Sequence, residues 1–76
     1  MKETLFVRLF NDSWIKLVGT EDELDEALDS SMGYGGLICG WSRDDSPIRL
    51  NYPGVNPNEL PIFEFDHFSE KFEKVN

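Results

Sequence analysis

The first twenty residues carry an apolar pattern that predicts a β-hairpin. Residues 4–10 (TLFVRLF) and 14–19 (WIKLVG) are rich in β-branched and aromatic side chains, and the turn signal NDS at 11–13 separates them. Apolar side chains occupy both faces of these strands, interrupted only by Arg8 and Lys16. In a strand with one solvent-exposed face, apolar and polar residues would alternate strictly. We therefore expect this hairpin to lie centrally in its sheet or to be covered on both sides.

The next segment predicts a helix that begins with a capping box. Thr20 supplies the N-cap hydroxyl, and Glu23 follows three residues later. The helix is expected over residues 21–30 and should end in SSMGYGG, where three glycines fall within residues 33–36. At 3.6 residues per turn one narrow stripe faces the core, and it consists of Leu24, Ala27, Leu28 and Ser31.

The second half of the chain predicts short strands separated by turns. Residues 37–41 (LICGW) form an apolar strand, and residues 48–52 (IRLNY) are its expected partner across the turn at 42–47. Three prolines and a glycine make residues 53–61 an ordered loop. Residues 62–68 (IFEFDHF) begin as an alternating strand.

The end of the chain favours a short helix over residues 66–76, capped by Asp66, with Phe68 and Phe72 at i, i+4 spacing. Both phenylalanines are expected in the core; a homodimer seam is the alternative. The whole chain, residues 1–76, is thus predicted to be one small α+β domain. It combines a four- to five-stranded, mainly antiparallel sheet with one acidic amphipathic helix packed on it and this short C-terminal helix.

The net charge is the most unusual feature of the composition. The 76 residues include 39% hydrophobic residues and ten aromatics (six Phe, two Trp, two Tyr), enough for one small core. Fifteen acidic residues against seven basic ones give a net charge of −8. Such a chain repels nucleic-acid phosphates and anionic membranes and is drawn to basic surfaces. Direct nucleic-acid or membrane binding is therefore not expected.

A single cysteine, Cys39, cannot form an internal disulfide, which indicates a reducing compartment. The N-terminal segment MKETLFVRLF holds too few apolar residues for a signal peptide or a membrane span. We therefore expect a cytoplasmic protein.

Candidate catalytic chemistry is sparse. Cys39 lies in an apolar run and is expected to be a buried thiol, because a nucleophile needs exposure and a cationic neighbour. One Cys with one His, His67, cannot make a zinc site, and the acids lack the spacing of a calcium-binding EF-hand. The glycine run at 33–36 follows a helix and has no nearby Lys, unlike a phosphate-binding loop. We expect no enzymatic activity, no metal and no cofactor.

The predicted helix is unusually anionic. It holds six carboxylates and no cation within nine positions: Glu21, Asp22, Glu23, Asp25, Glu26 and Asp29. The acids of the first turn complement the positive end of the helix dipole. That leaves Asp25, Glu26 and Asp29, at positions where a helix needing only solubility would commonly interleave Lys. Like charges four residues apart each cost about 0.2–0.5 kcal/mol.

Two rows of carboxylates on a rigid helix can imitate a stretch of phosphate backbone, since acids four residues apart are about 6 Å apart along the axis. Acids elsewhere could extend this surface if they share the same side: Asp44, Asp45, Glu59, Glu64, Asp66, Glu70 and Glu73. The first functional hypothesis is a non-enzymatic inhibitor that uses Glu21, Asp22, Asp25, Glu26 and Asp29 to occupy the basic surface of a nucleic-acid-binding protein. A nucleoid protein, a nuclease, RNA polymerase or a CRISPR effector would be such a partner.

In size, charge and expected build, the chain resembles the small acidic proteins that bacteriophages make to disable host DNA-binding proteins. The resemblance lies in composition and in no motif, so it implies a class of function and assigns no residue.

Two alternatives stay open. In one, an immunity protein, antitoxin or adaptor binds its partner through an aromatic and loop surface, with Trp14, Trp41 and Tyr52 as candidates and acidity serving only solubility. Trp14 and Trp41 both lie at predicted strand ends, where core packing is the plainer expectation for each. In the other alternative, the chain is a small housekeeping domain whose charge serves solubility alone.

Overall fold

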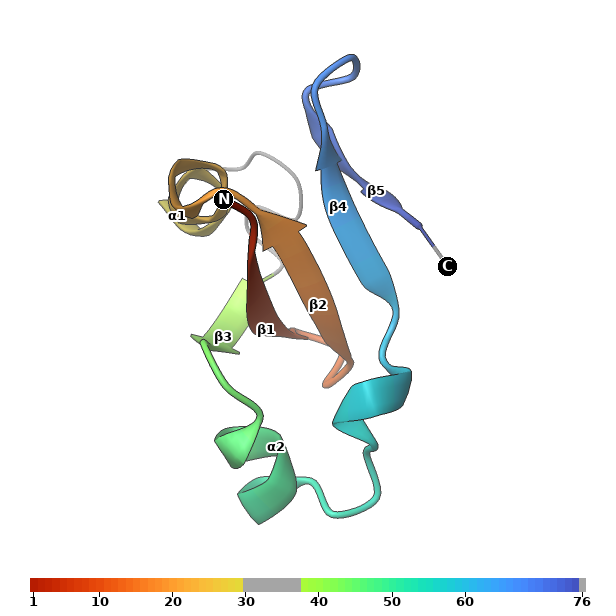
Figure 1. Ribbon diagram of the computed structural model, residues 1–76. Coiled ribbons are helices and arrows are strands. Elements are labelled where there is room, and N and C mark those ends of the chain that lie inside the picture. Colours follow the sequence, from red (N-terminus) through yellow and green to blue (C-terminus); the bar gives the residue numbers. More distant parts are fainter. Residues whose placement is uncertain (30–37, 76) are drawn as a thin grey trace.

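The predicted α+β class is confirmed by the computed structural model, which describes residues 1–29 and 38–75. Within these residues a five-stranded sheet has the strand order β3-β1-β2-β4-β5 (Figure 1). The elements in chain order are β1 (Glu3–Leu9), β2 (Trp14–Gly19), α1 (Glu21–Asp29), β3 (Ile38–Ser42), α2 (Ser46–Asn51), the 3-10 turn η1 (Pro57–Glu59), β4 (Ile62–Asp66) and β5 (Lys71–Lys74).

The sheet is mixed, with three antiparallel pairings and one parallel pairing. The predicted hairpin β1–β2 forms its centre, with Leu5 opposite Leu17. Strand β3 pairs antiparallel with β1, and β5 pairs antiparallel with β4. Strand β4 joins β2 in parallel, with Leu17 opposite Phe63. The chain therefore leaves β2, forms α1, β3 and α2, and returns beside β2 in the same direction.

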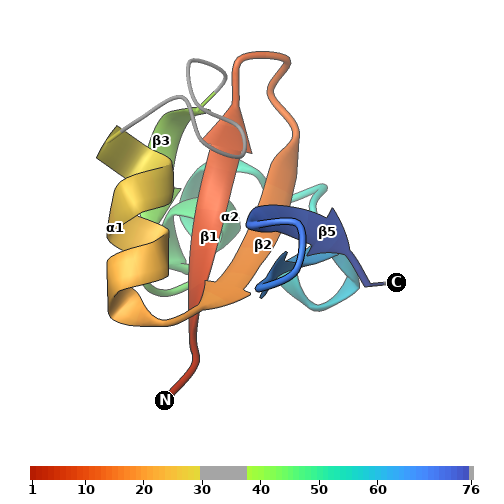
Figure 2. The same ribbon diagram turned by 90° about the horizontal axis from the view of Figure 1, so that it is seen from above.

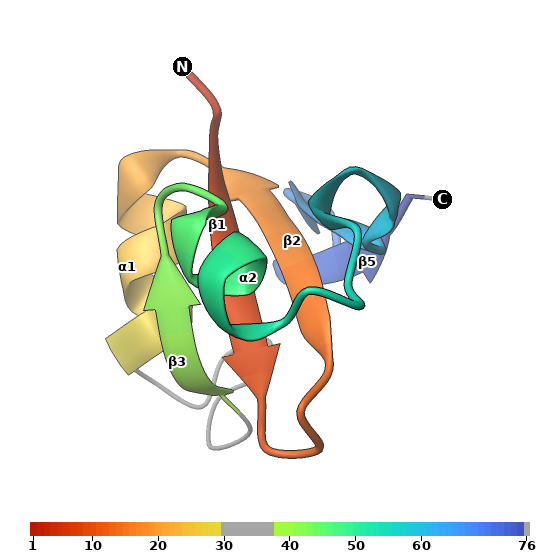
Figure 3. The same ribbon diagram turned by 90° about the horizontal axis from the view of Figure 1, so that it is seen from below.

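Apolar packing covers both faces of the central hairpin, as expected. On one face Leu5, Val7, Ile15 and Leu17 form a core cluster with Leu24 and Ala27 of α1 and Phe72 of β5. On the opposite face Trp14 packs with Ile48 of α2 and Leu60, against the partly buried Phe6, Tyr52 and Val55. The two helices lie on opposite sides of the sheet, with α1 in front in Figure 2 and α2 in front in Figure 3. A pattern with apolar residues on both faces thus reflects two cores that share one hairpin.

The capping box of α1 forms as predicted. The Thr20 N–H donates to Glu23 Oε1 at 2.8 Å, and the Glu23 N–H donates to Thr20 Oγ1 at 3.3 Å. Leu24 and Ala27 are buried and Leu28 is half-buried, which confirms the apolar stripe over these positions. Ser31 and the glycine run at 33–36 lie outside the described residues.

The prediction of a strand over residues 48–52 is wrong: residues 48–51 belong to α2, and Tyr52 is its C-cap. Pro47 lies in the first turn of α2, where its missing N–H costs no helical hydrogen bond. Ile48 is fully buried in the second core cluster, and one turn later the Tyr52 N–H donates to the Ile48 carbonyl at 2.8 Å. Strand β3 pairs with β1 instead of with this segment.

The predicted C-terminal helix is also wrong, because the chain turns back as β5. The Asp66 carboxylate accepts from the Phe68 N–H at 3.0 Å and from the Ser69 hydroxyl at 3.3 Å. Glu70 then adopts a left-handed φ of 57°, which ends the turn. Phe72 is 7% exposed, and its ring packs edge-on against that of Phe65, with 5.4 Å between the ring centroids. Phe68 is fully exposed, so its expected place in the core is wrong while that of Phe72 is confirmed.

Candidate functional site

The outer face of α1 is an exposed carboxylate surface. Leu24 and Ala27 hold the opposite side of the helix on the sheet, which fixes the orientation of its acids. All five predicted site residues of this helix are exposed: Glu21, Asp22, Asp25, Glu26 and Asp29. Glu23 differs, because its side chain is only 15% exposed and serves the capping box. Gly19 leaves room for that carboxylate, since a Cβ there would lie 2.8 Å from Glu23 Oε1.

Most of the chain's cations lie away from this surface. All seven Lys and Arg residues lie in the described part of the chain. Four of them form ion pairs: Lys2 with Glu64, Arg8 with Asp12 at 3.0 Å, Arg49 with Asp45 at 2.7 Å, and Arg43 with Glu3 at 3.4 Å and Glu21 at 3.8 Å. Lys16 lies over the ring of Phe6, and the other two, Lys71 and Lys74, lie on β5.

Among the Lys and Arg ion pairs of the described residues, Arg43 alone reaches a carboxylate of α1, and it does so at the first residue of the helix, Glu21. Asp22, Asp25 and Asp29 form no ion pair with any residue in 1–29 or 38–75. Because the chain's cations are placed elsewhere, the charges of Asp22, Asp25 and Asp29 are not balanced by an ion pair within the described residues.

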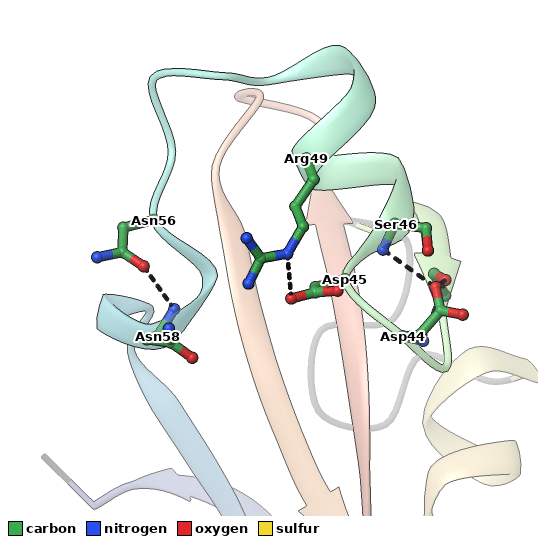
Figure 4. A network of polar contacts seen from close by, with 7 residues as sticks. Asp44, Asp45, Ser46, Arg49, Asn56 and Asn58 are labelled. Carbon is green, nitrogen blue, oxygen red and sulfur yellow. Dashed lines mark hydrogen bonds and ion pairs between the residues drawn. The ribbon is translucent and has the colours of Figure 1, made fainter.

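Asp44 and Asp45, which the sequence offered as extensions of this surface, are used by the local structure at the start of α2. The Asp44 carboxylate accepts from the Ser46 N–H at 3.1 Å and from the Ser42 hydroxyl at 3.3 Å. The hydrogen bond from the Ser46 N–H is the main reason that the pKa of Asp44 lies below its ordinary value. Asp45 pairs with Arg49 one turn along the same helix (Figure 4). Figure 4 also shows the Asn56 side chain accepting from the Asn58 N–H, which caps η1.

The aromatic candidates divide between surface and core. Trp41 is 52% exposed on β3, an edge strand of the sheet. Trp14 is buried, and Tyr52 is half-buried with its ring edge-on to Trp14 at 5.5 Å. Core packing, the plainer expectation for both tryptophans, is thus confirmed for Trp14 and wrong for Trp41, while Tyr52 is not the exposed residue that was expected. Among the three, Trp41 alone presents a large apolar area to solvent.

Sequence reasoning missed a depression between α1 and the β4–β5 turn. Glu26, Phe65, His67 and Glu70 line it, with a volume of about 280 Å³. His67 Nε2 lies 3.6 Å from Glu23 Oε2, and the imidazole is edge-on to Phe65 at 5.3 Å. The turn thereby brings Glu70 to the same hollow as Glu26, so the carboxylate surface continues from α1 onto the β4–β5 turn. No local pattern could have indicated this, because the contact joins segments far apart in the sequence.

Cys39 is half-buried on β3, not fully buried as expected, and it is free. Across residues 1–29 and 38–75, no three His, Cys, Asp or Glu side chains are grouped to hold a metal ion. Over the same residues, no helix has the length and apolar content to cross a membrane. The exposed carboxylates of α1 can accept charge-assisted hydrogen bonds from cationic groups.

Comparison of the chain with protein-family models, with curated proteins and with solved structures finds no match.

Proposed function

We propose that this protein is a non-enzymatic inhibitor that docks its α1 carboxylate surface on the basic nucleic-acid-binding surface of another protein and blocks access of nucleic acid. The observation that supports this function best is the unbalanced charge of α1. Asp22, Asp25 and Asp29 are exposed and have no ion pair with a described residue, while the chain's cations lie elsewhere.

Rigid placement makes these carboxylates suited to recognition. The buried Leu24 and Ala27 anchor the helix, so the row formed by Glu21, Asp25 and Asp29 keeps a spacing of about 6 Å per step along the axis. A partner that reads phosphates presents Arg and Lys, which form charge-assisted hydrogen bonds with carboxylates. The net charge of −8 accelerates the encounter with such a surface.

The proposed partner is a basic protein of the bacterial cytoplasm that handles nucleic acid, such as a nucleoid protein, a nuclease, RNA polymerase or a CRISPR effector. A phage protein that takes over a host or counters its defences would have this task.

The test is capture from bacterial lysate on the immobilised protein, followed by elution with duplex DNA. We expect DNA-binding proteins to be retained, to be released by DNA, and to be lost between about 50 mM and about 200 mM salt. Asp25→Lys and Glu26→Lys, separately and together, should abolish retention with the fold intact. Glu59→Lys is the matched control, because it makes the same single change of charge at an exposed residue of η1. Retention that survives the double reversal, or that DNA does not displace, would refute the proposal.

A second candidate function is a protein–protein adaptor, immunity protein or antitoxin, and the exposure of Trp41 on an edge strand favours it. Trp is enriched at the energetic centres of interfaces. In that case Trp41→Ala would weaken partner binding more than any change in α1, and salt would have little effect.

A further inference from the structure

The outer side of the β4–β5 hairpin holds a second pocket, of about 370 Å³. Its polar lining includes Glu64 of β4, Glu73 of β5 and Lys2 from the N-terminal segment. Its apolar lining includes Phe68 and Val75. The pocket lies beside the hollow next to α1, because Phe65 and His67 line both.

Two glutamates oppose each other in this pocket. Glu64 and Glu73 are direct cross-strand partners in the antiparallel β4–β5 pair. Side chains in that relation have Cβ atoms about 5 Å apart on the same face of the sheet, and like charges there are destabilising. The neighbouring pair on the same face, Asp66 opposite Lys71, has the ordinary arrangement of opposite charges. The like-charged pair is therefore a local exception that a bound cation would relieve.

The chain itself shows that the pocket accepts a cation. The Lys2 ammonium, from a residue 62 positions away in sequence, forms an ion pair with Glu64. Lys2 is 54% exposed in this contact, and Glu73 has no ion pair with a described residue. One carboxylate of the pair is thus paired with an exposed lysine side chain, and the other has no ion pair with a described residue.

The walls suit a cation with an apolar body. Phe68 is fully exposed and Val75 is 54% exposed, so both present apolar surface beside the carboxylates. Exposed apolar area rimmed by polar groups is typical of interaction sites. A guanidinium is planar, donates to two carboxylates at once and stacks on an aromatic ring, whereas an ammonium is a single point charge.

We infer that this pocket binds an arginine side chain of a basic partner protein, which displaces Lys2 and bridges Glu64 and Glu73 with its stem against Phe68 and Val75. The identity of the partner rests on the proposed function, but the pocket does not. It would give the inhibitor a second contact, beyond α1, that distinguishes an arginine-bearing partner from one bearing only lysine.

The test is an NMR titration of the protein with acetyl-Gly-Arg-Gly-amide, compared with the same peptide carrying lysine or the uncharged isostere citrulline. The arginine peptide should shift the amide signals of Glu64, Phe68, Glu73 and Val75 saturably, in the millimolar range, and bind more tightly than lysine. The citrulline peptide should not bind. Equal binding of all three, or shifts confined to α1, would overturn the inference.

Matched variants sharpen the test. Glu73→Gln should weaken arginine binding about fivefold, the order expected for one charge-assisted contact at an exposed site. Asp29→Asn removes the same charge from α1 and should leave binding within about twofold. Equal effects of these two variants would show that only net charge matters and would overturn the site.

Lys2→Ala removes the internal competitor and should tighten arginine binding by about twofold or more. Lys74→Ala is its control, since it removes the same charge from the opposite face of β5. If Lys2→Ala has no more effect than Lys74→Ala, Lys2 does not occupy the binding site and the inference fails. If lysate capture depends on α1 but the arginine peptide does not bind, the pocket is refuted and the proposed function stands. If the arginine peptide binds the pocket but capture does not depend on α1, only the proposed function is refuted.

Discussion

Replacing Asp25 by Lys should stabilise the folded protein while it abolishes partner binding. Asp25 is exposed in the middle of α1, and the residues four positions away on either side, Glu21 and Asp29, are exposed acids. Arg43 reaches Glu21 but not Asp25. The substitution therefore converts two like-charged pairs on one helix face into two pairs of opposite charge.

The expected gain follows from helix-pair energies. Each like-charged i, i+4 pair destabilises a helix by about 0.2–0.5 kcal/mol, and each opposite pair stabilises it by a similar amount. Two conversions amount to roughly 0.8–2 kcal/mol. The lower half of this range applies, because these side chains are exposed and only the pair between Glu21 and the introduced lysine has the favourable order of acid before base. A gain of about 1 kcal/mol raises the melting temperature of a domain of this size by about 4–8 °C.

Urea denaturation followed by circular dichroism measures this gain. At about 50 mM salt the midpoint of Asp25→Lys should exceed that of the wild type, and the excess should shrink at about 1 M salt, where exposed charges are screened. The higher helix propensity of Lys over Asp leaves a salt-independent remainder of a few tenths of a kcal/mol. Glu59→Lys, outside α1, should stay within about 0.5 kcal/mol of the wild type. If the midpoint of Asp25→Lys equals or falls below that of the wild type, repulsion between the carboxylates of α1 does not destabilise the fold.

Three further substitutions test the fold and its capping groups. Phe72→Ala should lower the free energy of unfolding by about 3–5 kcal/mol, because it empties a buried position between β5 and the first core cluster. Phe68→Ala should leave the urea midpoint unchanged, because Phe68 is fully exposed. Similar losses for both variants would refute the strand assignment of this segment. Thr20→Ala removes the N-cap hydroxyl of α1 and should lower the free energy of unfolding by about 1 kcal/mol in the same assay, so an unaffected midpoint would contradict the capping box. Because the pKa of Asp44 is lowered in the folded state, its carboxylate contributes stability above the ordinary value of 3.8 that is lost as the pH falls through the lowered pKa. Asp44→Asn should therefore lower the urea midpoint at pH 7, and the difference from the wild type should disappear at the acid end of a pH series. A difference that does not change with pH would refute the stabilising role of the ionised Asp44 carboxylate.

Elements with local signals were predictable from the sequence. The capping box at Thr20 and Glu23 forms because its hydrogen bonds join residues three positions apart. The β1–β2 hairpin forms where β-branched and aromatic runs flank the turn signal at residues 11–13, and its apolar content on both faces correctly indicated that the hairpin is covered on both sides. The exposure of the α1 acids also follows from helical periodicity alone, which is why the first part of the candidate site was predictable.

Short apolar runs were ambiguous, and long-range contacts decided them. IRLNY is compatible with a strand, but burial of Ile48 against Trp14 and Leu60 makes it a helix. Phe68 and Phe72 have helical spacing, yet the packing of Phe72 on Phe65 makes their segment a turn and a strand. In both cases the local preference was weaker than the free energy gained by burying one side chain in a core.

By itself, the sequence determined the α+β class, the central hairpin and an anionic helix without cations of its own, because these depend on contacts between near neighbours in the chain. Only the tertiary structure decided where the charges of distant segments meet. The parallel return of β4 beside β2 and the turn at Asp66 bring Glu70 to the hollow beside Glu26 and set Glu64 opposite Glu73. The same packing brings Lys2 to Glu64. Local pattern cannot report such encounters, because the free energy that selects them comes from burying apolar side chains contributed by segments far apart in the chain.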